Sequence, residues 1–148
     1  MTVESATSIN DLNASYPANT DARSEGAAHI RLIKTLLKAD RGLVISDKSA
    51  AYGFVLTDAN NAFRHPSTDT TARTWTIPAN ASIVFPVGTC LTFINQHSAG
   101  TLTIAITADT MRLAGSGSTG SRTLAADGIA TAIKIDTTEW IISGTGLT

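Results

Sequence analysis

A glycine-rich stretch in the last third of the chain has the spacing that dinucleotide-binding proteins use to hold a pyrophosphate. Gly115, Gly117 and Gly120 satisfy G-x-G-x-x-G, and Asp136 follows near the position of a ribose-binding carboxylate. In such proteins the bare glycines let the backbone approach the phosphates, whose charge lies at the N-terminus of the next helix. This chemistry therefore requires a helix that begins just after Gly120.

The residues after Gly120 predict a strand instead of that helix. The segment SRTLAADGIATAIKID contains Gly128 and then alternates apolar and polar residues with the period of a strand. Ser121 also stands where a P-loop carries its phosphate-binding lysine. We therefore interpret residues 114–122 as a flexible Gly/Ser loop that joins two strands, and we expect no bound cofactor.

Catalytic and metal-binding patterns are not found at other positions either. The three histidines, His29, His65 and His97, have no Cys, His or acidic partner at metal-ligand spacing. Cys90 lies in an apolar strand, where a buried structural thiol is expected rather than a nucleophile. There is no G-x-S-x-G elbow, and the carboxylates of the second half lie in turns or at strand ends. The sequence therefore predicts no catalytic residues and no metal site.

The two tryptophans could stack on a sugar ring or pack inside the protein. Trp75 and Trp140 both lie within apolar strands, in TWTI and EWII. Aromatic residues make up only 5% of the chain. We therefore expect both side chains to pack in a core or an interface.

From about residue 43 onward the apolar residues follow the period of a strand. In residues 101–107, large apolar residues alternate with Thr or Ala. In residues 129–135, the same period places Ile129, Thr131, Ile133 and Ile135 on one face of a strand. Further short strands are separated by turns such as PAN, PVGT and ADG, and no repeat of 20–50 residues is evident. This pattern predicts a mainly β domain over residues 41–148, built as an antiparallel β-sandwich, jelly roll or small barrel.

The first part of the chain has a different character. Residues 1–24 are rich in Ser, Thr, Asn and Asp, which predicts an extended arm or a disordered segment that folds against a partner. Ile30, Ile33 and Leu37 then recur at i, i+3 and i+7, with Leu36 beside them. This spacing predicts an amphipathic helix from about 25 to 39, whose apolar stripe must pack on another surface. Residues 1–40 are therefore expected to form an arm and an anchoring helix.

Charge and hydropathy narrow the range of partners. The formal net charge is −1, which argues against nucleic acid and anionic membranes as partners. No apolar run approaches the roughly 20 residues of a membrane span, and the first residues lack the features of a secretory signal. Charged residues are sparse from 70 to 148, which indicates that other subunits cover part of that surface. Ile30, Ile33 and Leu37 also fit the a and d positions of two heptads, which would help to align neighbouring chains. We therefore expect the chain to associate with itself as a homotrimer.

Two segments resemble proteins of bacteriophage particles. The segment INDLNASYPANTDARSEGAAHIRLIKTLLKAD is similar to the N-terminal anchor of many phage tail-fibre and appendage proteins. FVLTDANNAFRHPSTDTTARTWTIPANASIVFPVGTCLTFIN, GTLTIAI and TEWIISGTG resemble a β-rich domain at the C-terminal ends of phage virion proteins. The resemblance implies a non-enzymatic virion component, often trimeric, with an anchoring N-terminus. Typical fibres have long shafts between such pieces, whereas here the two are nearly adjacent.

The expected function is a short tail fibre, head fibre or capsid decoration protein, assembled in the host cytoplasm and located in the virion. Its partners would be further copies of itself and a phage capsid or tail protein, with attachment to head or tail left open. The candidate docking residues are Tyr16, Pro17, Ile30, Ile33, Leu36 and Leu37. The alternative is a module that binds a host receptor or surface glycan through the loops at 95–100 or 114–122. An enzyme acting on polysaccharide would need a clustered acid, base or nucleophile, which the spacing does not provide.

Overall fold

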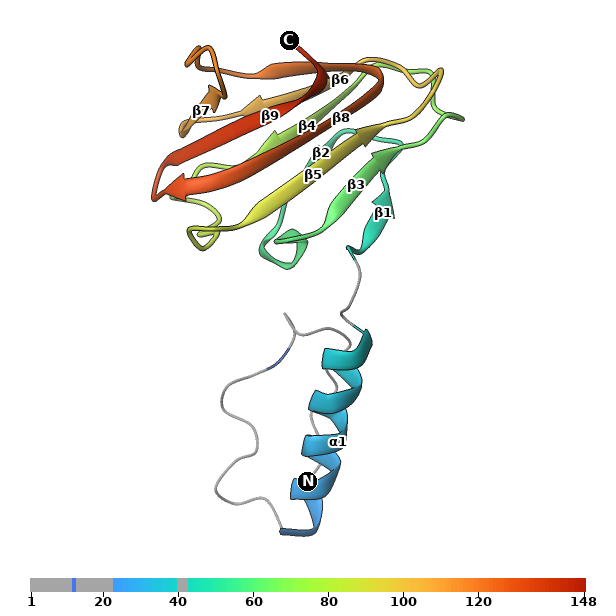
Figure 1. Cartoon of the computed structure of the whole chain (residues 1–148), viewed down its shortest axis with the longest axis vertical. Helices are drawn as coiled ribbons and strands as arrows, with labels where there is room; N and C mark the ends of the chain where they lie inside the picture. The colour runs from blue at the N-terminus through green and yellow to red at the C-terminus, as the bar shows by residue number, and fades with distance from the viewer. Residues whose placement is uncertain (1–11, 13–22, 40–42) are drawn as a thin grey trace. The chain divides into compact units, whose positions relative to one another are not determined.

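The computed structural model describes residues 12, 23–39 and 43–148, and it contains one helix followed by a β-rich unit (Figure 1). Helix α1 spans Arg23–Ala39 and confirms the predicted amphipathic helix, with a start two residues earlier than expected. The chain divides into two compact units, residues 1–44 and residues 45–148, which are described separately below.

The second unit confirms the prediction of a mainly β domain. Its described elements, in chain order, are β1 (Ile45–Asp47), β2 (Tyr52–Gly53), the 3-10 turn η2 (Leu56–Asp58), β3 (Ala62–His65), β4 (Arg73–Ile77), β5 (Cys90–Asn95), β6 (Leu102–Ile106), β7 (Thr110–Leu113), β8 (Arg122–Asp136) and β9 (Glu139–Leu147).

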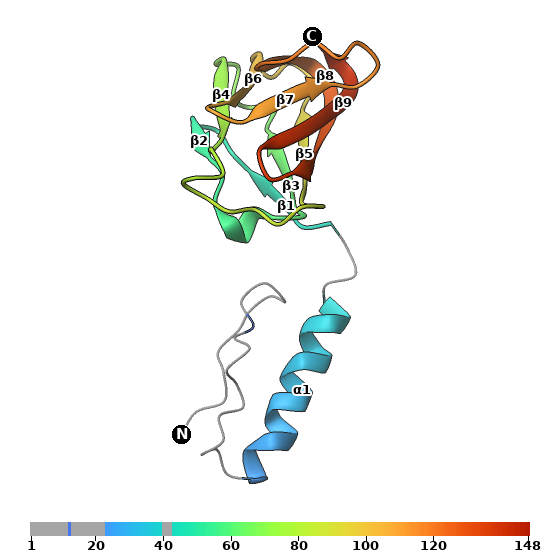
Figure 2. The same ribbon diagram turned by 90° about the vertical axis from the view of Figure 1, so that its left-hand side faces the viewer.

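The strands form one curled sheet whose two halves pack against each other. The strand order is β1-β3-β5-β8-β6-β4-β2, and β9 pairs with both β8 and β7. Successive strands therefore alternate between an odd wall (β1, β3, β5) and an even wall (β2, β4, β6), which lie on opposite sides of the unit (Figure 2). The long strand β8 belongs to both walls: residues 122–124 pair with β6, and residues 129–133 pair with β5.

The prediction of an antiparallel arrangement is wrong for most neighbouring strands. The pairs β1–β3, β3–β5, β2–β4, β4–β6 and β7–β9 are parallel, and only the pairs that involve β8 are antiparallel. Two parallel neighbours need a crossover between them. In this chain, each crossover between neighbours of the odd or even wall runs through a strand of the opposite wall. The alternation of apolar and polar residues identifies a strand but does not say which strand lies beside it.

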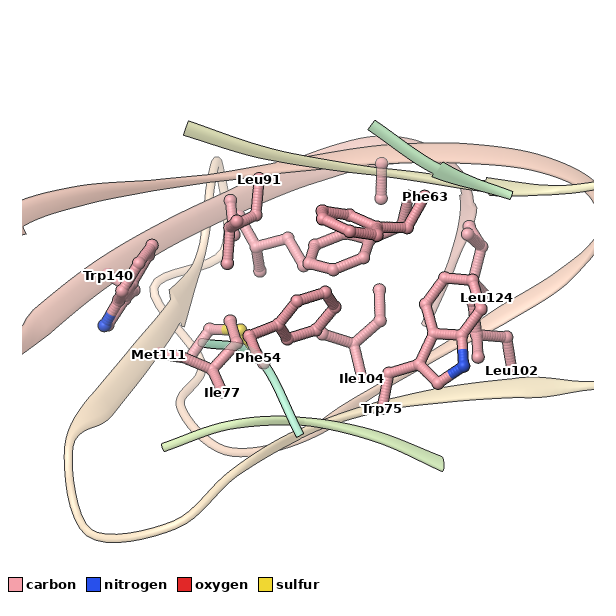
Figure 3. Close-up of a cluster of buried hydrophobic side chains, with 14 of the residues drawn as sticks. Phe54, Phe63, Trp75, Ile77, Leu91, Leu102, Ile104, Met111, Leu124 and Trp140 are labelled. Atoms are coloured by element: carbon pink, nitrogen blue, oxygen red, sulfur yellow. The ribbon is translucent and has the colours of Figure 1, made fainter. Parts of the chain in front are cut away.

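The core lies between the two walls and is built around aromatic rings (Figure 3). The parallel register aligns Phe63 with Phe93 in the odd wall and Trp75 with Ile104 in the even wall. Phe54 lies among them, with ring centroids 4.8 Å from Phe63 and 5.6 Å from Phe93 at edge-to-face angles. Aromatic pairs prefer this geometry because the edge of one ring is positive and the face of the other negative.

A short turn holds Phe54 at this central position. The Phe54 amide donates to the Thr76 carbonyl, and the buried Asp58 carboxylate accepts from the Val55 amide. The same carboxylate accepts the hydroxyl of Tyr52 at 2.9 Å. Burial, together with this hydrogen bond, raises the pKa of Tyr52 to about 12. The turn is thus tied to the even wall through β4 and β2.

The two faces of β8 differ in the size of their side chains. Ala130, Ala132 and Lys134 point inward and are buried. Ile129, Ile133 and Ile135, which the sequence places on one face, point outward and are 49%, 41% and 45% exposed. The aromatic rings already fill the space between the walls, so only small residues fit inside most of β8.

Candidate docking site

Helix α1 presents an apolar stripe on its exposed side. Ile30, Ile33 and Leu37 are 55%, 40% and 57% exposed, whereas the neighbouring positions His29 and Leu36 are buried. The apolar arc of the helix is therefore wider than the stripe that the spacing indicates, and one edge of this arc is exposed. The i, i+3, i+7 spacing of the exposed edge is the pattern with which a helix fits into an apolar groove of a partner.

The candidate docking residues thus have different positions in the structure. Ile30, Ile33 and Leu37 lie together on the exposed stripe, while Leu36 is buried beside it. Tyr16 and Pro17 lie outside the described residues. Arg31 and Lys34 are exposed on the same helix, so an acidic rim around the groove of a partner would complement them.

The glycine-rich segment joins β7 to β8, as the sequence predicts, and several of its polar groups already form hydrogen bonds within the unit. The amides of Gly117 and Gly120 donate to the carbonyls of Leu113 and Met111 at 2.9 and 3.0 Å. The guanidinium of Arg112 donates to the Gly117 carbonyl at 3.1 Å. A phosphate cradle needs such amides and cations to be free for the ligand. The strand β8, rather than a helix, follows the loop.

His65 belongs to a buried polar network that the sequence analysis missed. Its Nδ1 lies 3.0 Å from Oδ1 of Asn95, and its Nε2 lies 3.0 Å from Oδ2 of Asp69. Arg73 also donates to the carboxylate of Asp69 at 2.7 Å and, with His65, holds the pKa of that carboxyl well below its usual range. Both ring nitrogens of His65 thus have a partner inside the β unit.

The same network connects three parts of the β unit. The side-chain amide of Asn95 donates to the carbonyls of Gly100 and Leu124, each at 3.0 Å. The Asp69 carboxylate also accepts the Thr71 amide, which fixes the turn before β4. The His65 network therefore joins that turn to β5 and β8, and its geometry is that of a structural element.

Lys134 is a second buried polar group without a sequence signal for its partners. Its Nζ donates to the Asn80 side-chain oxygen and to the Phe85 carbonyl, and it lies 5.9 Å from the centre of the Trp140 ring. The backbone N–H of Asn80 in turn donates to the carboxylate of Asp109. These contacts tie the segment between β4 and β5 to the inner face of β8.

The predicted burial is confirmed for the two tryptophans but not for the cysteine. Trp75 and Trp140 are buried, as predicted, and the Trp75 indole donates to the Ala50 carbonyl. Cys90 was expected to be buried but is half-exposed, because its position in β5 points away from the core. Over residues 23–39 and 43–148, no group of three or more His, Cys, Asp or Glu side chains is arranged to hold a metal ion.

Comparison with known proteins identifies no family for this chain. No protein-family model matches the sequence, and no curated protein matches it. Among the described residues, no helix is long and apolar enough to cross a membrane.

Proposed function

We propose that this chain is a non-enzymatic structural protein of a bacteriophage virion. It is a short fibre or decoration-type appendage that attaches to the capsid or tail through residues 1–40. The β unit forms its body and associates with further copies as a homotrimer. The protein is assembled in the host cytoplasm and acts in the virion.

The exposed stripe of α1 is the observation that carries this proposal. Ile30, Ile33 and Leu37 leave an apolar edge uncovered in their own unit, although a helix of this length depends on burying such an edge. The β unit, by contrast, has a complete core of its own. The helix thus needs a partner surface, whereas the β unit does not, and this division suits an anchored appendage. The resemblance of both segments to phage virion proteins supports the choice of a phage particle.

Attachment is tested by adding protein to particles that lack this component. The full chain and a fragment of residues 41–148 are incubated with such particles, and the copies bound after sedimentation are counted. The full chain is expected to bind and the fragment to remain in the supernatant as a folded, cooperatively melting protein. Equal occupancy by the fragment would place the attachment surface in the β unit and contradict the proposal.

Single substitutions separate the stripe from the rest of the helix. Ile33→Asp and Leu37→Asp each place an unpaired charge in the docked seam and should sharply lower the number of bound copies. Thr35→Asp is the matched control, because Thr35 is exposed on another side of the same helix. Loss of binding by the control, or full binding by both stripe variants, would show that the stripe is not the docking surface.

The alternative function, recognition of a host glycan, lacks an exposed aromatic platform in the described residues. Trp75, Trp140 and the four phenylalanines are buried, and Tyr52 is half-buried against Asp58. In the loop at 95–100, exposed His97 pairs with Asp127 at 3.1 Å. No described side chain therefore favours this alternative over the structural role.

A further inference from the structure

The amine of Lys134 is enclosed inside the β unit. The side chain lies on the inner face of β8 and is only 1% exposed. Lysines seldom occupy such positions, because burial of an unpaired ammonium is costly. In the part of the chain that the structure describes, Nζ forms no ion pair with an Asp or Glu, and its hydrogen bonds go to the neutral oxygens of Asn80 and Phe85. The amine therefore faces neutral groups of its own chain.

The contact with Asn80 brings a nucleophile close to a carbonyl carbon. Nζ of Lys134 lies 2.5 Å from Oδ1 of Asn80. Because a C=O bond is about 1.23 Å long, the amide carbon Cγ can lie no more than about 3.7 Å from Nζ. Reacting atoms in a near-attack arrangement are roughly 3–3.5 Å apart. The terminal torsion of Asn is broad, so a small rotation turns the face of the carbonyl toward Nζ.

The backbone holds both groups in this arrangement. The N–H of Lys134 donates to the Thr89 carbonyl at 2.9 Å. The N–H of Asn80 donates to the carboxylate of Asp109 at 3.0 Å. A second bond from Nζ, to the Phe85 carbonyl at 2.9 Å, limits the positions that the amine can take. Two groups fixed in this way react as parts of one molecule, which removes much of the entropic barrier.

Aromatic rings exclude water from the amine. Phe85 and Trp140 are 1% and 0% exposed, and their rings meet edge to face with centroids 5.8 Å apart. Nζ of Lys134 lies 5.9 Å from the centre of the Trp140 ring, which is at the end of the core opposite Trp75 (Figure 3). A desolvated amine is a better nucleophile than a hydrated one, and exclusion of water prevents competing hydrolysis of the amide.

We infer that Lys134 and Asn80 become joined by an isopeptide bond within the folded chain. The neutral amine attacks Cγ of Asn80, the Nζ–Cγ bond forms, and the Cγ–Nδ2 bond breaks. Two protons of the Lys134 ammonium leave with Nδ2 as an ammonium ion, and the third stays on the new amide nitrogen. The step consumes no oxidant, reductant or co-reactant. This modification goes beyond the proposed function and does not depend on it.

The bond would fasten the strand that joins the two walls. It links β8 to the segment between β4 and β5 and closes a loop over residues 80–134. A crosslink of this kind restricts the unfolded chain, as a disulfide does, and so favours the folded state. Unlike a disulfide, it is not broken by reducing agents.

The test measures the intact mass of the purified full chain by mass spectrometry after denaturation. Most molecules should weigh less than their amino-acid sequence by the mass of one ammonia molecule. After tryptic digestion, residues 74–112 and 123–148 should appear as one branched peptide that is uncleaved after Lys134. An unreduced mass, or separate linear peptides 74–112 and 123–134, would overturn the inference.

Substitutions assign the lost ammonia to the two residues. Lys134→Met removes the amine and Asn80→Ala removes the carbonyl, so each variant should have the full mass of its sequence. Lys48→Met is the matched control, because Nζ of Lys48 lies 3.9 Å from the centre of the Tyr52 ring. This control should lose ammonia like the unaltered chain.

The fold of each variant is verified by thermal unfolding followed by circular dichroism. Loss of ammonia by Lys134→Met or Asn80→Ala, or its absence in Lys48→Met, would contradict the assignment. The branched peptide of the unaltered chain decides the question even where a variant does not fold.

Discussion

Replacement of Phe54 tests whether a residue outside the strands organises the core. Phe54 is buried, and its ring makes edge contacts with Tyr52, Phe63, Phe93 and Trp75. Phe54→Ala removes most of this side chain, and changes of this type cost about 3–5 kcal/mol in well-packed cores. Phe54→Leu keeps much of the apolar volume but loses the ring geometry, which contributes about 0.5–1.5 kcal/mol per aromatic pair.

The two substitutions therefore predict an ordered series of stabilities. Phe54→Leu should lower the free energy of unfolding by about 1–2 kcal/mol, because ring pairs that share one residue are not additive. Phe54→Ala should lower it by at least 3 kcal/mol, a large part of the roughly 5–15 kcal/mol available to a domain. Val55→Ala is the control, because the neighbouring Val55 is exposed, and it should cost less than about 1 kcal/mol.

Urea unfolding followed by tryptophan fluorescence measures all three variants, since Trp75 and Trp140 are both buried in the β unit. The midpoint should shift in the order Val55→Ala, Phe54→Leu, Phe54→Ala at an unchanged slope. A loss below about 1 kcal/mol for Phe54→Ala would mean that the site is not packed as described, and it would refute the central role of this ring.

Three further predictions concern β8, the His65 network and the glycine-rich loop. Ala132→Leu should destabilise the β unit by about 1–3 kcal/mol through overpacking, whereas Thr131→Leu on the outward side should be nearly neutral; urea unfolding measures both. Because the folded state lowers the pKa of Asp69, its ion pair with Arg73 stabilises the fold above the ordinary carboxyl range and is lost as the pH falls through and below about 4. Asp69→Asn should therefore reduce the dependence of the free energy of unfolding on pH below about 4. An unchanged pH dependence in this range would contradict the prediction. Gly117→Ala should cost on the order of 1 kcal/mol, because Gly117 has a positive φ of 74°. Calorimetry on the unaltered chain should detect no NAD or ATP, and saturable binding would contradict the interpretation of the loop.

The sequence predicts the elements of this fold better than their arrangement. The period of the apolar residues locates helix α1 and most strands of the β unit, since both depend on local spacing. The path of the chain between the two walls depends on which strands become neighbours. The number of residues between one strand and its neighbour in the same wall differs from pair to pair. Ile45 pairs with Ala62, for example, and Ala62 with Thr92, so no constant repeat is visible.

One signal for the His65 network is present in the sequence. Phe63-Arg64-His65 and Phe93-Ile94-Asn95 share the pattern of an aromatic residue followed two positions later by a polar one, and the parallel register aligns them. The pattern becomes meaningful only once the two segments are known to be neighbours. The spacing of metal-ligating or catalytic residue types along the chain does not reveal it.

The helix illustrates the same limit for the candidate docking site. The spacing of Ile30, Ile33 and Leu37 identifies an apolar stripe, but spacing alone does not say which edge of the apolar arc is covered. His29 and Leu36 are buried and the stripe is exposed, so the choice depends on packing rather than on period. Cys90 was misplaced for a related reason, because an apolar strand has two faces and only one of them meets the core.

The position of β8 determines when this protein can become folded during its synthesis. In the part of the chain that the structure describes, the backbone ladders of the two walls are joined through β8, which pairs with β6 near its start and with β5 further along. A growing chain that ends before residue 122 therefore has both walls but no strand to join them, and its aromatic core stays open to water. Closure waits until the ribosome has released residues 122–136. Until then the nascent chain exposes the apolar surface on which chaperones act.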